Sequence, residues 1–175
     1  MSELNRMSVE EFRNSEKTPI VLVLDNIRSQ SNIGSIFRTA DAFRLERIYL
    51  CGITATPPHR EIHKTALGAT ESIEWKYFPD TIQAVRELIV EGYRVLAVEQ
   101  AIGSASLADY HPVSDKKHAF VLGNEVNGID DQVLDLVHAC IEIPQSGTKH
   151  SLNVAVATGI VIWDLLGKIK KTAER

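Results

Sequence analysis

The chain has 175 residues, of which 44% are hydrophobic and 24% are charged, and its formal net charge is −4. These are ordinary values for a globular domain that is large enough to bury a core. The acidic balance gives no global basic signature, so a nucleic-acid partner would require a local positive surface.

Aliphatic runs alternate with segments of helical periodicity along the chain. The predicted strands are 19–26, 47–52, 72–78, 93–100, 119–124 and 140–143. The predicted helices are 32–43, 61–67, one that starts at Pro79 and Asp80 and closes at Gly92, 130–139 and 151–170. This order predicts an α/β fold, a mostly parallel sheet flanked by helices. We expect one domain, residues 1–175, with an N-terminal extension (1–19), a core (20–168) and a basic tail (169–175).

Polar residues and glycines gather in four segments that follow predicted strands: 26–34, 99–103, 123–128 and 144–151. In open α/β sheets, ligands bind beyond the carboxyl ends of the strands. The four segments are therefore the expected walls of a binding site. Within them, Asn32 is expected to cap the helix that follows, and Gly34, Gly123 and Gly147 are expected to give access to the backbone.

Several common motifs fail on inspection. Residues 123–128 have the glycine spacing of a phosphate loop, but Ile129 and Asp130 replace its Lys-Ser/Thr pair. No glycine-rich dinucleotide fingerprint follows the first strand, and no G-x-S-x-G is present. His59 and His63 are spaced for a shared metal, but no third ligand is evident, so no metal site is predicted. These failures disfavour a nucleotide-binding hydrolase or a reductase, which is kept as an alternative enzyme class.

The two cysteines, Cys51 and Cys140, lack metal or redox spacing and indicate a reduced, intracellular protein. The first 19 residues do not have the pattern of a secretory leader, and the apolar run 154–166 is too short to span a membrane. A cytoplasmic protein with no membrane partner is the expectation.

Three patterned segments stand out: N-x-G-x-x-x-R within 24–43, L-G-x-E-x-x-G within 120–129, and I-P-x-x-G-x-x-x-S-L-N-V within 143–157. In order and spacing they resemble the signature motifs of the SpoU/TrmH class of the SPOUT superfamily. Those proteins are S-adenosylmethionine-dependent RNA ribose 2′-O-methyltransferases. The resemblance covers about residues 20–168. The matching residues are Asn32, Gly34, Arg38, Leu122, Gly123, Glu125, Gly128, Ile143, Pro144, Gly147, Ser151, Leu152, Asn153 and Val154.

The resemblance implies a C-terminal deep trefoil knot that holds S-adenosyl-L-methionine. The cofactor contacts carried over are Glu99, Gly123, Ile143 and Leu152. It also implies a homodimer whose active sites are completed across the interface. Such an interface accounts for the final helix, which is apolar on most faces, with Val156, Ile160 or Trp163 expected to meet the partner. Burial of that helix within a monomer is the alternative.

The catalytic residues implied by the resemblance are Arg38, Asn32, Glu125, Ser151 and Asn153. Arg38 either acts as the base on the 2′-hydroxyl or, since a guanidinium normally stays protonated, clamps a phosphate and stabilises the developing alkoxide. The alternative is that Arg38 has no catalytic role and forms an ion pair at the surface. Glu125 is expected to orient Arg38 or to bind across the interface. Ser151 and Asn153 are expected to bind the hydroxyl or the arginine, or to cap the helix that they precede.

A 2′-hydroxyl acceptor means RNA and excludes DNA. The third motif and its neighbours look closest to the tRNA enzymes that methylate a D-loop guanosine, so tRNA is favoured over ribosomal RNA. Only about nineteen residues precede the first strand, so a separate N-terminal RNA-binding domain is not expected. A non-catalytic RNA-binding module on the same fold is another alternative. The candidate backbone contacts are Arg28, Arg38, Arg44, Arg60, Lys64, Lys149, His150, Lys168, Lys170 and Lys171.

Overall fold

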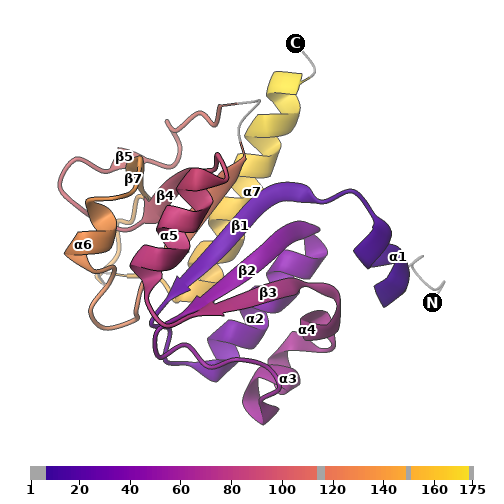
Figure 1. The fold of residues 1–175 in the computed structure, drawn as a ribbon. Helices are drawn as coiled ribbons and strands as arrows, with labels where there is room; N and C mark the ends of the chain where they lie inside the picture. The colour runs from indigo at the N-terminus through magenta and orange to yellow at the C-terminus, as the bar shows by residue number, and fades with distance from the viewer. Residues whose placement is uncertain (1–6, 114–116, 149–150, 174–175) are drawn as a thin grey trace.

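A seven-stranded sheet forms the centre of the protein, seen in a computed structural model that describes residues 7–113, 117–148 and 151–173 (Figure 1). Its strand order is β3-β2-β1-β6-β4-β7-β5, and every paired strand runs parallel to its neighbour. The strands are β1 (Thr18–Asp25), β2 (Leu45–Cys51), β3 (Glu74–Phe78), β4 (Arg94–Val98), β5 (Ala105–Ser106), β6 (His118–Leu122) and β7 (Ala139–Glu142). The predicted α/β class and the mostly parallel sheet are confirmed.

Helices cover both faces of this sheet, because its strands are apolar on both sides. In β1, Ile20, Leu22 and Leu24 point into one core cluster, whereas Val21 and Val23 point into the other. Helices α2 and α7 pack on the first face and α5 and α6 on the second (Figure 1). The helices are α1 (Val9–Asn14), α2 (Gln30–Ala42), α3 (Arg60–Ala66), α4 (Ala69–Ser72), α5 (Thr81–Val90), α6 (Asp131–Leu134) and α7 (Val154–Ala173).

The central strands end together at one edge of the sheet. Leu24 of β1 pairs with Leu122 of β6, Leu122 pairs with Val98 of β4, and Val98 pairs with Ile141 of β7. The segments that follow these four residues therefore leave the sheet side by side. They are the segments predicted to form a binding site.

Two predicted helix starts are wrong. Helix α2 begins at Gln30, and its N-cap is Ser29, whose side chain accepts a hydrogen bond from the backbone N–H of Asn32. Asn32 thus lies in the first turn, and its side chain is free for other contacts. Helix α7 begins at Val154, three residues after the predicted start.

The predicted helix 130–139 is wrong over most of its length, because α6 is a single turn. The backbone N–H of Leu136 bonds to Val133, and that of His138 bonds across to Val95 of β4. The backbone therefore bonds to β4 rather than within a helix by His138, one residue before β7 begins.

The segment treated as an N-terminal extension contributes to the core. Helix α1 starts with a reciprocal capping box between Ser8 and Glu11, and Phe12 is buried in the cluster beneath α2. The Arg13 guanidinium donates to the backbone oxygen of Glu71, which attaches α1 to the end of α4. Sequence periodicity missed α1, α4 and β5 because each is only two to six residues long.

Within the described ranges, no helix is both long enough and apolar enough to cross a membrane.

Candidate functional site

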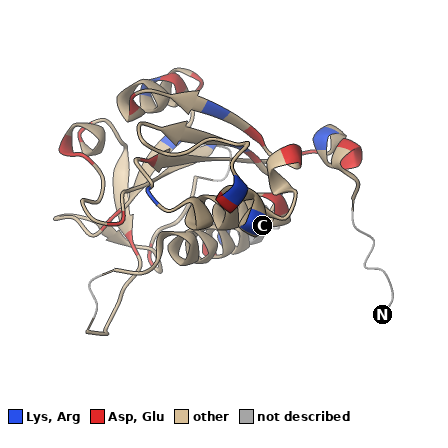
Figure 2. Ribbon diagram, turned by 90° about the horizontal axis from the view of Figure 1, so that it is seen from below, with Lys and Arg blue, Asp and Glu red and all other residues tan. Residues whose placement is uncertain are grey.

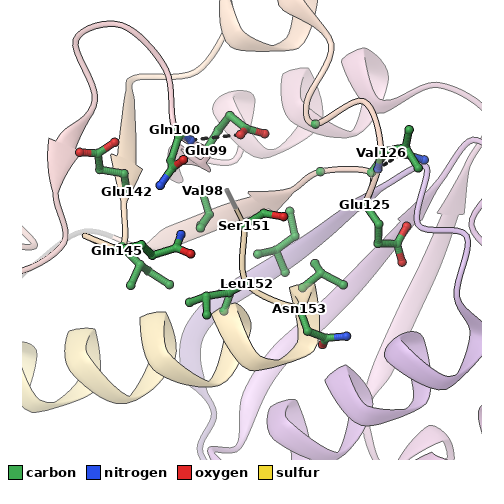
Figure 3. Close-up of a pocket in the computed structure, with 17 residues that line it drawn as sticks. Val98, Glu99, Gln100, Glu125, Val126, Glu142, Gln145, Ser151, Leu152 and Asn153 are labelled. Carbon is green, nitrogen blue, oxygen red and sulfur yellow. Dashed lines mark hydrogen bonds between the residues drawn. The ribbon is translucent and has the colours of Figure 1, made fainter. Parts of the chain in front are cut away.

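A cavity of about 500 Å³ lies at the carboxyl edge of the central strands, where the second and third motifs meet (Figure 3). The segments after β4, β6 and β7 and the start of α7 form its walls. Its lining residues are Val98, Glu99, Gln100, Leu122, Gly123, Asn124, Glu125, Val126, Gly128, Glu142, Ile143, Gln145, Ser151, Leu152, Asn153, Val154 and Ala157. All four predicted cofactor contacts are among them, as are three of the five predicted catalytic residues.

A chain of hydrogen bonds joins all three motifs beside this cavity. The Asn32 amide donates to Oε1 of Glu125 over 3.2 Å, and the Asn153 amide donates to Oδ1 of Asn32 over 3.1 Å. Glu125 also accepts the backbone N–H groups of Arg28 and Ser29. Residues separated by more than 90 positions in the sequence are therefore fixed relative to one another.

Asn153 has a second role as the capping residue of α7. Its Oδ1 accepts the backbone N–H groups of Ala155 and Val156 over 2.9 and 3.3 Å. A side-chain oxygen in this position satisfies donors that the first helical turn leaves unpaired. Capping belongs to Asn153 rather than to Ser151, which is exposed at the cavity wall.

The hydrogen bonds around Glu125 change its acidity. Partial burial alone would raise the pKa of this carboxyl, but the hydrogen bonds that it accepts from its own backbone N–H, those of Arg28 and Ser29, and the Asn32 amide lower the pKa below its ordinary value of 4.5. Glu125 is thus held as a carboxylate next to Asn32.

Glu99 fastens the loop that follows β6. Its Oε2 accepts the N–H of Ile129, and its Oε1 accepts the N–H of Gln100. A Cβ atom at Gly128 would lie 2.7 Å from Oε2 of Glu99, and Gly128 has a φ of +70°. Gly128 is therefore required both by the turn and by the approach of this carboxylate.

Close packing by itself requires glycine at positions 123 and 34, and access to a ligand at these positions stays a prediction. A Cβ atom at Gly123 would lie 2.6 Å from the carbonyl carbon of Gly128, because the loop folds back on itself. One at Gly34 would lie 2.1 Å from Oγ1 of Thr65 on α3. Among the described residues, no atom lies within 4 Å of a Cβ atom built at Gly147, so backbone access there stays a prediction.

Arg38 does not join the cavity of its own chain. It lies on the exposed side of α2, and it forms no hydrogen bond or ion pair with any residue that the structure describes. The alternative of a surface ion pair thus finds no support in these residues. The guanidinium is available for a partner outside this chain.

Four polar residues of the cavity wall were not among the site residues predicted from the sequence: Gln100, Asn124, Glu142 and Gln145. Asn124 donates to the backbone oxygen of Asn26 and accepts the N–H groups of Val126 and Asn127, so it shapes the loop that carries Glu125. It is a variable position of the second motif, and only its turn-forming tendency could have indicated it. Gln100 is the second residue after β4, Glu142 is the last residue of β7, and Gln145 is a variable position of the third motif, so no motif pointed to them.

Helix α7 presents an apolar stripe to the outside. Val156, Ile160 and Trp163 are 52%, 38% and 71% exposed, and their spacing puts them on one side of the helix. The opposite side, with Val161, Ile162 and Leu165, is buried against the sheet. The alternative that α7 is buried wholly within a monomer is therefore wrong for the described chain.

Basic and acidic positions are interspersed along the ribbon of the described residues (Figure 2). Of the predicted backbone contacts, Lys168 pairs with Asp164 over 2.6 Å and donates to the backbone oxygen of Leu107, so it belongs to the folded end of α7. Lys64 pairs with Glu61 over 2.7 Å. Lys149 and His150 lie outside the described residues, as do the side chains of Lys170 and Lys171 and the final residues of the expected basic tail.

The chain is similar in sequence and fold to known RNA methyltransferases. The sequence profile of the SpoU rRNA methylase family matches residues 19–163. A 23S rRNA (guanosine-2′-O-)-methyltransferase of Neisseria meningitidis is 28% identical over 151 residues, which are 86% of this chain and 59% of that protein. A tRNA (guanosine(18)-2′-O)-methyltransferase of Mus musculus is 29% identical over 147 residues, which are 83% of this chain and 9% of that protein.

Among solved structures, an AdoMet-bound rRNA methyltransferase from Sinorhizobium meliloti matches with a TM-score of 0.78 and 29% identity. The match covers 87% of this chain and 58% of the other. The chain thus spans less than two thirds of the length of each of these three relatives.

Proposed function

The chain belongs to the SpoU rRNA methylase family, and from this premise we propose that it transfers a methyl group from S-adenosyl-L-methionine to a ribose 2′-hydroxyl of RNA. The observation that carries the proposal is the hydrogen-bonded chain Glu125–Asn32–Asn153 at the rim of a cavity lined by the expected cofactor contacts. The relative from Sinorhizobium meliloti, with the same fold, is described as AdoMet-bound.

The residues present fit such a cofactor. The cavity volume of about 500 Å³ lies within the range of about 300–1,000 Å³ that small-molecule sites occupy. Ile143 and Leu152 offer apolar surface for a flat ring, and Glu99 and Glu142, which lie across the cavity from Leu152 in Figure 3, suit a cationic group. When bound, the cofactor supplies a methyl group already activated by its positive sulfur.

The protein's own residues would position the acceptor. Asn32, held between Glu125 and Asn153, presents a fixed amide near the start of α7, and Ser151 offers a hydroxyl from the cavity wall. Alignment of the reacting groups can supply about 7–11 kcal/mol in favourable cases. Arg38 would bind an RNA phosphate or stabilise the developing alkoxide; the alternative role, as the base, is kept open for test.

We propose a homodimer that covers the stripe formed by Val156, Ile160 and Trp163. The stripe begins at Val156, three residues after Asn153, so the interface would lie next to the hydrogen bonds that join Asn153, Asn32 and Glu125. A symmetric dimer is the simplest way to bury one apolar stripe on each of two identical chains. It would also bring a second Arg38 to the neighbourhood of each cavity.

The trefoil knot and the cytoplasmic location remain predictions.

The acceptor is proposed to be a guanosine ribose. The relatives from Neisseria meningitidis and Mus musculus differ in the RNA that they are named for but agree on guanosine. Between the two RNAs, tRNA remains the preferred substrate on the likeness of the third motif, with ribosomal RNA as the alternative.

Two measurements test the proposal. Calorimetry with S-adenosylmethionine, ATP and NAD should give binding only with the first; preference for ATP or NAD would contradict it. Transfer of a labelled methyl group should then be measured on separate tRNA and ribosomal RNA fractions lacking the modification, with mapping of the labelled nucleotide. Cofactor binding without transfer to either RNA would favour a non-catalytic RNA-binding module.

A further inference from the structure

The wall of the cavity is strongly acidic. Glu99, Glu125 and Glu142 line it, and no Lys, Arg or His does so among the residues that the structure describes. None of the three forms an ion pair in the described part of the chain, and all their hydrogen-bond donors are uncharged. Within the described residues, no neighbouring cationic side chain therefore pairs with these three carboxylates.

Two of these carboxylates come from neighbouring strands. Val98 of β4 pairs with Ile141 of β7, so Glu99 and Glu142 leave the sheet next to each other. Figure 3 shows both on one side of the cavity, with Leu152 and Asn153 on the other. A ligand in the cavity would lie between a negative wall and the first turn of α7.

Glu142 is the carboxylate with the most freedom to act on a ligand. Glu125 accepts three hydrogen bonds from the segment 28–32, and Glu99 accepts one at each oxygen. Glu142 accepts one, at Oε2, from the Ser104 hydroxyl over 2.8 Å. Within the described chain, its Oε1 has no donor.

We propose that Glu142 makes the cavity selective for the positively charged methyl donor over the neutral thioether that remains after transfer. The inference rests on the proposed function. Methyl transfer breaks a C–S bond and forms a C–O bond; the bonding pair returns to sulfur, and the hydroxyl proton leaves to solvent. The ligand in the cavity thereby loses one positive charge. Its attraction to the carboxylates weakens, which promotes its release.

The size of the effect follows from Coulomb's law. A unit charge about 8 Å from a carboxylate in a half-solvated cavity gains about 1 kcal/mol, which is roughly a five-fold change in affinity. The donor and the product share their adenosine, amino and carboxylate groups. They differ in the methyl group and in the charge on sulfur, so a change in their affinity ratio when only the charge at position 142 is removed reports on the charge on sulfur.

The experiment is calorimetry of the full chain with S-adenosylmethionine and S-adenosylhomocysteine. In Glu142→Gln, which keeps an oxygen for the Ser104 hydroxyl, we expect affinity for the donor to fall roughly five-fold and affinity for the product to change less than about two-fold. Glu142→Asp keeps the charge and should keep the wild-type ratio. Ser104→Ala keeps the charge but loses the hydrogen bond, so it should leave the ratio unchanged even if both affinities fall.

Equal losses for both ligands in Glu142→Gln would overturn the inference, because they would mean a contact with a group that both ligands share. An unchanged ratio with unchanged affinities would also overturn it. Since attraction between charges is screened by salt, the wild-type ratio should shrink at high ionic strength. Failure of the wild-type protein to bind S-adenosylmethionine at all would instead overturn the proposed function, and this inference with it.

Discussion

The amide of Asn153 donates a hydrogen bond to Oδ1 of Asn32 over 3.1 Å, although 121 positions separate the two residues in the sequence. The same Asn153 caps α7 through its oxygen. One side chain therefore sets both the start of the final helix and the orientation of Asn32 towards Glu125.

Replacement of Asn153 by Asp should separate these two roles. Asp is an equally good capping residue, so the melting temperature should change little. Oδ1 of Asn32 would then face a carboxylate instead of a donor, and methyl transfer should fall by roughly 10- to 100-fold because the site is no longer held in place. Asn153→Ala is the matched variant, which loses the cap as well and should be less stable by about 1 kcal/mol. Full activity of Asn153→Asp would argue against a positioning role for Asn153.

Glu125 should contribute to stability in a pH-dependent way. Its pKa is lowered in the folded protein, so the ionised form is favoured by folding. That contribution is present above the ordinary value of 4.5 and is lost as the pH falls through the lowered pKa. Denaturant unfolding of the wild type and of Glu125→Gln from pH 3 to pH 7 should show a difference in free energy at neutral pH that disappears at low pH. A constant difference would mean that the charge of Glu125 is not responsible.

The stripe on α7 should control the oligomeric state. Val156→Asp puts a charge in the proposed interface and should convert a dimer to a monomer in sedimentation experiments at micromolar concentration. Val90, at the end of α5 and 88% exposed, offers a matched control, because Val90→Asp should leave the mass unchanged. A wild-type protein that sediments as a monomer would contradict the proposed dimer.

Arg38 should be needed for transfer but not for binding of the cofactor. Because it does not line the cavity of its own chain, Arg38→Ala should bind S-adenosylmethionine with near wild-type affinity. Its rate of transfer should fall by about 10²- to 10³-fold, the usual cost of removing one stabilising donor. The pH–rate profile of Arg38→Lys then separates the two roles: a shifted profile indicates a base, and an unshifted, lower profile indicates an electrostatic clamp. Full activity of Arg38→Ala would exclude both.

The convergence of the motifs could be predicted from the sequence. A parallel sheet brings the carboxyl ends of its strands to one edge, so the segments 99–103, 123–128 and 144–151 were expected to lie together. The family resemblance added Glu99, Gly123 and Ile143 as contacts, and all three line the cavity. The sequence also indicated that the final helix is apolar on most faces but left two explanations open, a partner subunit or burial within a monomer. The exposure of Val156 and Trp163 excludes the second for the described residues.

The sequence did not predict which of several neighbouring polar groups would form a given hydrogen bond. Ser29 and Asn32 both suit a helix start, and only the structure shows that Ser29 takes the cap while Asn32 turns to Glu125. The helix predicted over 130–139 ends at Leu134, because the backbone N–H of His138 bonds to the oxygen of Val95 on β4 instead of to a helical carbonyl. The contact between Glu142 and Ser104 depends on loop closure over 38 positions, which periodicity does not report.

The position of the transferred methyl group tests the central claim most directly. A methyl group on a ribose 2′-oxygen blocks attack of that oxygen on the adjacent phosphate, so alkali cannot cleave the RNA there. After transfer of labelled methyl groups and complete alkaline hydrolysis, the account predicts that the label is recovered in alkali-resistant dinucleotides whose 5′ nucleoside is guanosine. Recovery of the label in mononucleotides would show methylation of a base and would contradict the account.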